Sequence, residues 1–221
     1  MAVGFMSRLS IGKKKKKSLS DIIMNQDWKQ LEFECTMRGK RAKKKSKLVG
    51  FYDGTFNARV LPLHQMCAYN PPKATLLSVI EAHPRAVYKR EHTFERVPLQ
   101  IACLNGASDD VILTLLSFFK GAAEHRDVAG RVALHYACCN DVSDQVIKAL
   151  LDAYPDAINC RDDTGWLPIH VACTSGASLS VIRTLLLARP QTILSKTKKG
   201  SNPLSCTKMG NGYNMAEVMS F

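Results

Sequence analysis

The stretch TGWLPIHVACTSGASLSVIRTLLLARPQTI, residues 164–193, decides the fold because it recurs along the chain. The preceding copy, residues 129–158, reads AGRVALHYACCNDVSDQVIKALLDAYPDAI, and a third, residues 94–116, reads FERVPLQIACLNGASDDVILTLL. A looser copy opens at LPLHQMCAYNPP, and a fragment, SNPLSCTKMG, lies near the end of the sequence. The anchor positions are spaced 36, 35, 35 and 35 residues apart, at Pro62, Pro98, Ala133, Pro168 and Pro203. Self-similarity at such a period predicts a solenoid of stacked repeats.

Each repeat predicts a pair of helices. Proline fits the first position of the first helix, where its missing N–H would have no partner in any case. Small residues such as Ala172 and Cys173 follow on that helix and let neighbouring helices approach closely. The second helix carries a V-I-x-x-L-L stripe, typical of a half-buried helix. Serine is expected as its N-cap, at Ser108, Ser143 and Ser178. One such pair cannot bury its apolar face alone, whereas stacked pairs can.

At these residues the unit resembles the ankyrin repeat, whose pattern is G-x-T-P-L-H-x-A-x-x-x-G followed by an outer helix ending in L-L. The resemblance covers about residues 55–221 and implies an all-α solenoid whose helix pairs are joined by turn or β-hairpin fingers. The sequence departs from the pattern in three ways, one of which is that the motif histidine is replaced at Gln100 and Ser205. Each unit is longer than the family's usual 33 residues. Hydrophobic residues also replace the motif threonine, at Leu61, Val97, Val132 and Leu167. These departures change turn geometry and leave the predicted fold intact.

The resemblance divides the chain as follows. Residues 1–17 are expected to be a disordered basic tail, and residues 18–54 an atypical N-terminal cap with one helix at about 19–35, a core anchor at Trp28 and a basic loop. Four repeats then span about residues 55–94, 95–129, 130–164 and 165–200. Residues 201–221 are expected to form a partial C-terminal repeat, which leaves open whether the chain belongs to a longer protein.

The positive charge is concentrated in the N-terminal segment. The chain carries 31 bases and 19 acids, a formal charge of +12. Residues 1–50 contain 14 bases and 4 acids, whereas the remaining residues contain 17 and 15. The bases form two clusters, made of Lys13, Lys14, Lys15, Lys16 and Lys17, and of Lys40, Arg41, Lys43, Lys44, Lys45 and Lys47. Three interpretations stay open: a solvated extension, a nuclear-targeting signal, or an electrostatic tether to nucleic acid or anionic membrane.

No constellation of residues predicts catalysis, a metal site, a cofactor or a small-molecule substrate. The motif histidines, His64, His135 and His170, are expected to hydrogen-bond backbone groups. The adjacent carboxylates Asp109-Asp110 and Asp162-Asp163 lie at turns and helix starts, where they are expected to complement the helix dipole. Four cysteines recur at one repeat position and are interpreted as small core residues, at Cys67, Cys103, Cys138 and Cys173.

The resemblance implies a binding surface on the concave face, formed by the turn tips and the exposed sides of the inner helices. The partner would be another protein, and its identity does not follow from the fold. The strongest candidates are aromatic residues and arginines, which dominate binding hot spots. The full candidate set is Tyr69, Phe94, Arg96, Asn105, Arg126, Arg131, Asn140, Arg161, Asp163, Trp166, Thr174 and Ser175. Simple packing of Phe94 and Trp166 against a neighbouring turn is the alternative interpretation.

The sequence also bears on location. It contains no apolar run of about 18 residues, so no transmembrane helix is expected. Its first residues lack the apolar stretch and cleavage site of a secretory signal. We therefore expect an intracellular, cytoplasmic or nuclear, protein.

Overall fold

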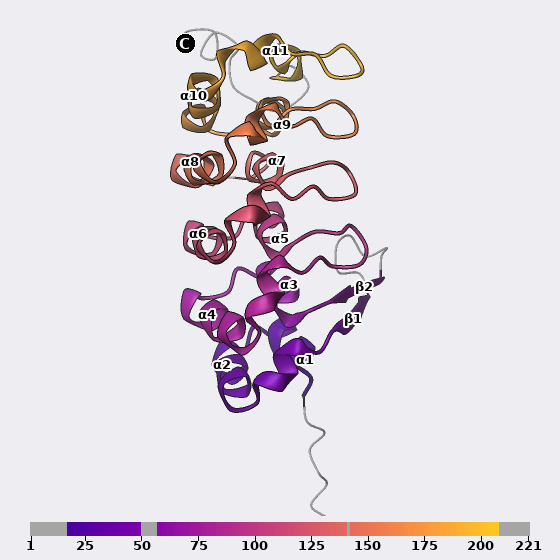
Figure 1. Ribbon diagram of the computed structural model, residues 1–221. Helices are drawn as coiled ribbons and strands as arrows, with labels where there is room; N and C mark the ends of the chain where they lie inside the picture. Colours follow the sequence, from indigo (N-terminus) through magenta and orange to yellow (C-terminus); the bar gives the residue numbers. More distant parts are fainter. Residues whose placement is uncertain (1–16, 50–56, 141, 208–221) are drawn as a thin grey trace, which may run out of the picture.

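The computed structural model describes residues 17–49, 57–140 and 142–207. Figure 1 shows a stack of helix pairs, with inner and outer helices in two columns and the loops of the later pairs projecting to one side. The inner column consists of α1 (Leu19–Met24), α3 (Pro62–Cys67), α5 (Pro98–Leu104), α7 (Ala133–Ala137), α9 (Pro168–Ser175) and α11 (Pro203–Thr207). The outer column consists of α2 (Trp28–Met37), α4 (Lys73–Ala82), α6 (Asp109–Phe118), α8 (Asp144–Ala153) and α10 (Leu179–Ala188). The predicted all-α solenoid is confirmed.

Short 3-10 helices follow the outer helices and turn the chain toward the next pair. They are η1 (Gly39–Lys43), η2 (Pro84–Tyr88), η3 (Lys120–Ala123), η4 (Pro155–Asn159) and η5 (Pro190–Leu194). Three of them, η2, η4 and η5, begin with a proline, and the outer helix ends before it because the residue preceding proline is disfavoured in a helix. β1 (Ser46–Val49) and β2 (Asn57–Val60) form a two-stranded antiparallel sheet that pairs Ser46 with Val60.

The stack shares one core. Each inner helix contacts the next inner helix, and each outer helix contacts the next outer helix. Ala102, Ala137 and Ala172 have no exposed surface, because at these positions inner helices pack closely. The buried hydrophobic cluster runs without interruption from Leu19 in α1 to Cys206 in α11. Stability therefore depends on contacts between neighbouring units, as expected of a solenoid.

The helix starts follow the sequence with one exception. Proline occupies the first turn of α3, α5 and α9. Ser143 and Ser178 cap α8 and α10 through their hydroxyl oxygens, which accept the N–H groups of Val146 and Val181. Ser108 is the N-cap residue of α6, but its side chain makes no capping bond.

The single helix expected at about 19–35 is two helices in the structure. Gln26 lies at φ 52°, in the left-handed region that a helix interior does not tolerate. Asp27 then caps α2 by accepting the Gln30 N–H at 3.2 Å. This break turns α2 so that it contacts α4, while α1 contacts α3. Trp28 is half-buried against the common core.

All eight cysteines are free, and seven of them are buried. Burial raises the pKa of the Cys103 thiol to about 12, so this thiol is uncharged in the core. The four cysteines at the shared repeat position act as small hydrophobic residues, as the sequence predicts. Among the described residues, no helix is long and apolar enough to cross a membrane.

Two glycines provide a matched test of how closely the units approach. Gly165 and Gly200 have φ values of 83° and 82°. A Cβ atom on Gly165 would lie 2.8 Å from the Lys198 backbone nitrogen, whereas one on Gly200 would meet nothing within 4 Å. We expect Gly200→Ala to cost about 1 kcal/mol of unfolding free energy through backbone strain alone. Gly165→Ala should cost about 2–4 kcal/mol because a neighbouring backbone must also move.

Urea unfolding of the two full-length variants measures this difference. Equal losses would contradict the close approach of neighbouring units at Gly165.

Candidate protein-binding surface

Four loops project from the stack and are here called the fingers: residues 90–96, 126–131, 161–166 and 196–201. Single backbone hydrogen bonds join neighbouring fingers near their tips. Val128 N donates to Phe94 O at 3.1 Å, and Asp163 N donates to Ala129 O at 3.0 Å. The Lys198 N–H continues the series by donating to Thr164 O. The fingers therefore form one connected row.

A buried acceptor at the base of each finger holds the loop closed. In the second finger, Asp127 Oδ1 accepts the N–H groups of Ala129 and Arg131, each at 3.0 Å. In the first, the Glu91 carboxylate accepts from Thr93, Phe94 and Arg96. In the third, Asp162 Oδ1 accepts from Thr164 and Trp166. In the fourth, the Thr197 hydroxyl accepts the Ser201 N–H alone. A carboxylate that accepts several backbone N–H groups replaces the hydrogen bonds that a tight turn cannot make internally.

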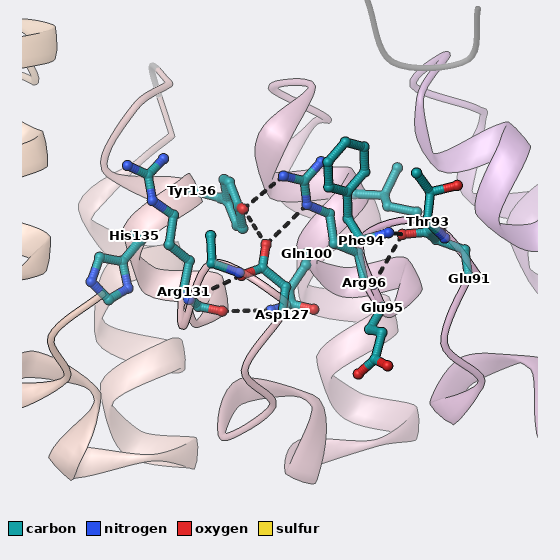
Figure 2. Close-up of polar contacts among 12 residues, drawn as sticks. Glu91, Thr93, Phe94, Glu95, Arg96, Gln100, Asp127, Arg131, His135 and Tyr136 are labelled. Atoms are coloured by element: carbon teal, nitrogen blue, oxygen red, sulfur yellow. Dashed lines mark hydrogen bonds and ion pairs between the residues drawn. The ribbon is translucent and has the colours of Figure 1, made fainter. Parts of the chain in front are cut away.

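Arginines from one finger neutralise the carboxylate of the next. Arg96 Nε lies 3.1 Å from Asp127 Oδ2, and its side chain is only 12% exposed. The Tyr136 hydroxyl donates to the same Asp127 oxygen and accepts from Arg96 Nη2 at 3.0 Å. Figure 2 shows Arg96 and Tyr136 converging on Asp127. Arg131 repeats the contact with Asp162 Oδ2 at 3.1 Å.

The role of the carboxylates at the finger bases was not predicted from the sequence, although their regular spacing provides a signal. Glu91, Asp127 and Asp162 are spaced 36 and 35 residues apart, like the repeat anchors. The expectation that Asp162 complements a helix dipole was wrong, because its carboxylate caps a finger. Burial opposes ionisation of Asp162, yet bonds from Thr164, Trp166 and Arg131 hold its pKa below the ordinary value. It is therefore a charged, internally compensated group.

The motif histidines bind backbone carbonyls, as predicted. His64 Nε2 lies 2.8 Å from Lys89 O, His135 Nε2 3.1 Å from Trp166 O, and His170 Nε2 3.0 Å from Ser195 O. Burial lowers the pKa values of His64 and His135 to about 4. Neutral, buried imidazoles that are bonded to backbone on the inside of the stack hold the fingers against the helices.

Seven of the predicted partner-binding residues are half-buried in contacts within the protein. Arg96 stacks on Phe94, with its guanidinium carbon 4.5 Å from the ring centroid. Asn140 Nδ2 donates to Cys103 O at 2.7 Å and so links two units. The half-buried group consists of Tyr69, Phe94, Arg96, Arg131, Asn140, Trp166 and Thr174. The exposed group consists of Asn105, Arg126, Arg161, Asp163 and Ser175.

The basic patch is only partly described. Outside the described residues lie Lys13, Lys14, Lys15 and Lys16, and Lys47 is described only in its backbone. The rest of the expected tail, the loop after β1 and the chain beyond Thr207 also lie outside the described residues. Arg41 is half-buried, forms an ion pair with Glu34 and donates to Lys17 O at 2.6 Å. The exposed members are Lys17, Lys40, Lys43, Lys44 and Lys45. Lys40 and Lys43 lie in η1, and Lys44 and Lys45 follow it directly.

No group of three or more His, Cys, Asp or Glu residues suited to a metal ion occurs in the described ranges. The arrangement of stacked helix pairs with a row of fingers defines a helical-repeat protein. A family model described as ankyrin repeats, in three copies, matches residues 99–199. Residues 99–199 therefore carry ankyrin repeats, as the sequence pattern predicts. No curated protein matches the sequence significantly. Ankyrin repeats generally mediate protein–protein interaction, and the family is typically non-catalytic.

Proposed function

We propose that this protein is a non-catalytic scaffold or adaptor that binds a partner protein on the concave face of its repeat stack. The observation that carries the proposal is the connected row of fingers, braced from within. Internal bonds hold the finger bases through Asp127 and Asp162, while Arg126, Arg161 and Asp163 remain exposed along the row. A surface already held in its binding geometry loses little conformational entropy on association.

The inner helices extend this surface. Asn105 and Ser175 lie at the ends of α5 and α9 and are exposed. Stacked repeats present such positions in a regular array, which suits an extended partner segment. We place the half-buried Phe94 and Trp166 as supports of the finger row, with their exposed edges available to the partner.

We also propose that the protein acts in a reducing, intracellular compartment, cytoplasmic or nuclear. Eight free cysteines support this location, because free thiols persist where cellular reductants keep them reduced. Cys139, which is only half-buried, would be the first to oxidise elsewhere.

Site-specific photo-crosslinking in living cells tests the proposed face. A photoreactive amino acid is placed in the full-length chain at Asn105 or Ser175 on the concave side. The matched positions are Ser117 and Asp152, which are exposed on α6 and α8 of the outer column. We expect protein adducts of discrete mass from the concave positions and none from the outer ones.

Adducts of equal yield on both sides, or adducts from the outer positions alone, would overturn the proposal. Urea unfolding of each variant confirms that the substituted chain remains folded.

A further inference from the structure

One finger position is basic in four consecutive units. Arg90, Arg126, Arg161 and Lys196 are spaced 36, 35 and 35 residues apart, and all four are exposed. We call them the basic column. Because the spacing equals the repeat length, the four residues occupy equivalent places on successive fingers. The chain after residue 50 is nearly neutral, with 17 bases and 15 acids, so its net charge does not account for a row of four exposed bases.

The two central members are held in the same geometry. Arg126 Nη1 donates to Gly130 O of its own finger and to Arg161 O of the next, each at 3.0 Å. Arg161 Nη1 donates to Gly165 O and to Lys196 O, each at 2.8 Å. Within the described residues these bonds use one nitrogen of each guanidinium group. The remaining donors of two fixed, exposed cations are therefore left for a ligand.

The excess of positive charge belongs to the fingers and not to the opposite side of the stack. The exposed bases of the fingers are Arg90, Arg126, Arg161, Lys196, Lys198 and Lys199, against the exposed acids Glu95 and Asp163. The outer helices α4, α6, α8 and α10 carry no such excess: their exposed bases are Lys73, Lys148 and Arg183, and their exposed acids are Glu81, Asp110 and Asp152. Charge distribution thus distinguishes the two sides.

From this column we infer that the fingers bind an extended acidic segment of the partner protein, with a carboxylate at about every third residue. The inference rests on the proposed function and names the chemistry of its partner. Packed helices lie 8–10 Å apart, so equivalent positions on successive units are about 10 Å apart. A polyproline II segment has three residues per turn and rises about 3.1 Å per residue. Every third side chain then faces the fingers. Successive side chains on that face lie about 9 Å apart, which matches the spacing of the basic column.

Carboxylates suit these cations better than nucleic acid does. Arginine presents a planar fork that bonds a carboxylate in two places. Proteins that bind single-stranded nucleic acid add aromatic rings on which bases stack. In the four fingers the rings of phenylalanine and tryptophan are those of Phe94 and Trp166, and both are half-buried. The column therefore offers charge pairing without a stacking platform.

Fluorescence anisotropy with a synthetic peptide tests the inference on the full-length protein. The probe is about ten residues long, the span of four carboxylates in polyproline II, with glutamate at every third position and proline or alanine between. We expect Arg126→Gln/Arg161→Gln to weaken binding about tenfold, as the loss of two exposed charge pairs implies. Lys196→Gln/Lys199→Gln provides a second test on exposed lysines that brace no neighbouring finger in the described structure.

Two control variants remove charge elsewhere. Lys73→Gln/Lys120→Gln removes two exposed charges from the outer side, on α4 and at the start of η3. The other control replaces Lys13, Lys14, Lys15, Lys16 and Lys17 by serine. Both should leave the peptide affinity within about twofold, since neither variant removes a charge from the basic column.

The inference is overturned by an equal loss in either control variant, or by equal affinity for a peptide of the same composition with its glutamates consecutive. Tighter binding of a single-stranded oligonucleotide of equal charge through Arg126 and Arg161 would show a nucleic-acid surface instead. The inference can fail while the proposed function holds. Crosslinks on the concave side that survive Arg126→Gln/Arg161→Gln would retain a protein partner and reject its acidic segment.

Discussion

Asp127→Ala is expected to lower the free energy of unfolding by about 3–5 kcal/mol, the range found when one member of a buried charge pair is removed. Its side chain has no exposed surface and compensates Arg96, whose own side chain is only 12% exposed. The substitution also removes the acceptor of the Ala129 and Arg131 N–H groups and of the Tyr136 hydroxyl. Three donors would then lose this acceptor, and the Arg96 guanidinium would lose its ion pair with Asp127.

Asp163→Ala is the matched control. Asp163 is exposed in the third finger, so its loss should change stability by no more than about 0.5 kcal/mol. Urea unfolding followed by circular dichroism measures both variants. A loss below about 1 kcal/mol for Asp127→Ala would show that the finger base is solvated, contrary to the burial of Asp127.

The fold could be predicted from the sequence because its signals repeat. Proline at the start of α3, α5 and α9 and the apolar stripe of the outer helices each appear several times at one period. A local signal that would be weak once becomes specific when it recurs at a constant spacing. The same logic correctly identified the buried cysteines, because Cys103, Cys138 and Cys173 share one position on the inner helices.

The N-terminal pair was predicted less well because it occurs once. Its apolar residues fit a helix of about 19–35, and the break depends on the backbone of Gln26 and the cap formed by Asp27. Glutamine has no preference for the left-handed region, so its identity does not indicate a turn. Packing of α1 on α3 and of α2 on α4 favours the break, and that packing is not visible in a local segment.

The candidate surface divides in the same way. Arginine and aromatic types suggest hot spots, but the type alone does not say whether a side chain faces solvent or the next finger. Arg96 and Arg131 are paired with acids 31 residues further along the chain. Their pairing depends on how the units stack. Arg126 and Arg161 directly precede the acids of these pairs in the sequence, yet both are exposed. Only the three-dimensional arrangement distinguishes the exposed arginines from the paired ones.

Acidification is expected to destabilise this protein between about pH 6.5 and pH 4, and His135→Gln should remove part of that loss. Burial lowers the pKa of His135 from 6.5 to about 4. In this window the unfolded chain binds a proton that the folded chain does not, so the unfolding free energy falls as the pH falls. At about 1.4 kcal/mol per pH unit, His135 accounts for a loss of up to about 3 kcal/mol, which is complete below pH 4.

Glutamine is the matched replacement because the chain already uses it at the equivalent position. Gln100 Oε1 accepts the Val97 N–H at 3.1 Å, and Gln100 Nε2 donates to Arg131 O at 2.9 Å. His135 makes the same two bonds, with Nδ1 accepting from Val132 N at 3.2 Å and Nε2 bonded to Trp166 O. The variant should therefore retain wild-type stability near pH 7 within about 1 kcal/mol, and exceed it by about 2 kcal/mol at pH 4.5. Urea unfolding between pH 7 and pH 4 measures this difference, and His92→Gln, at an exposed histidine, is the control. Parallel profiles for His135→Gln and the wild type would contradict the prediction. They would mean that the imidazole titrates alike in the folded and unfolded chains, and that burial in the stack does not hold it neutral.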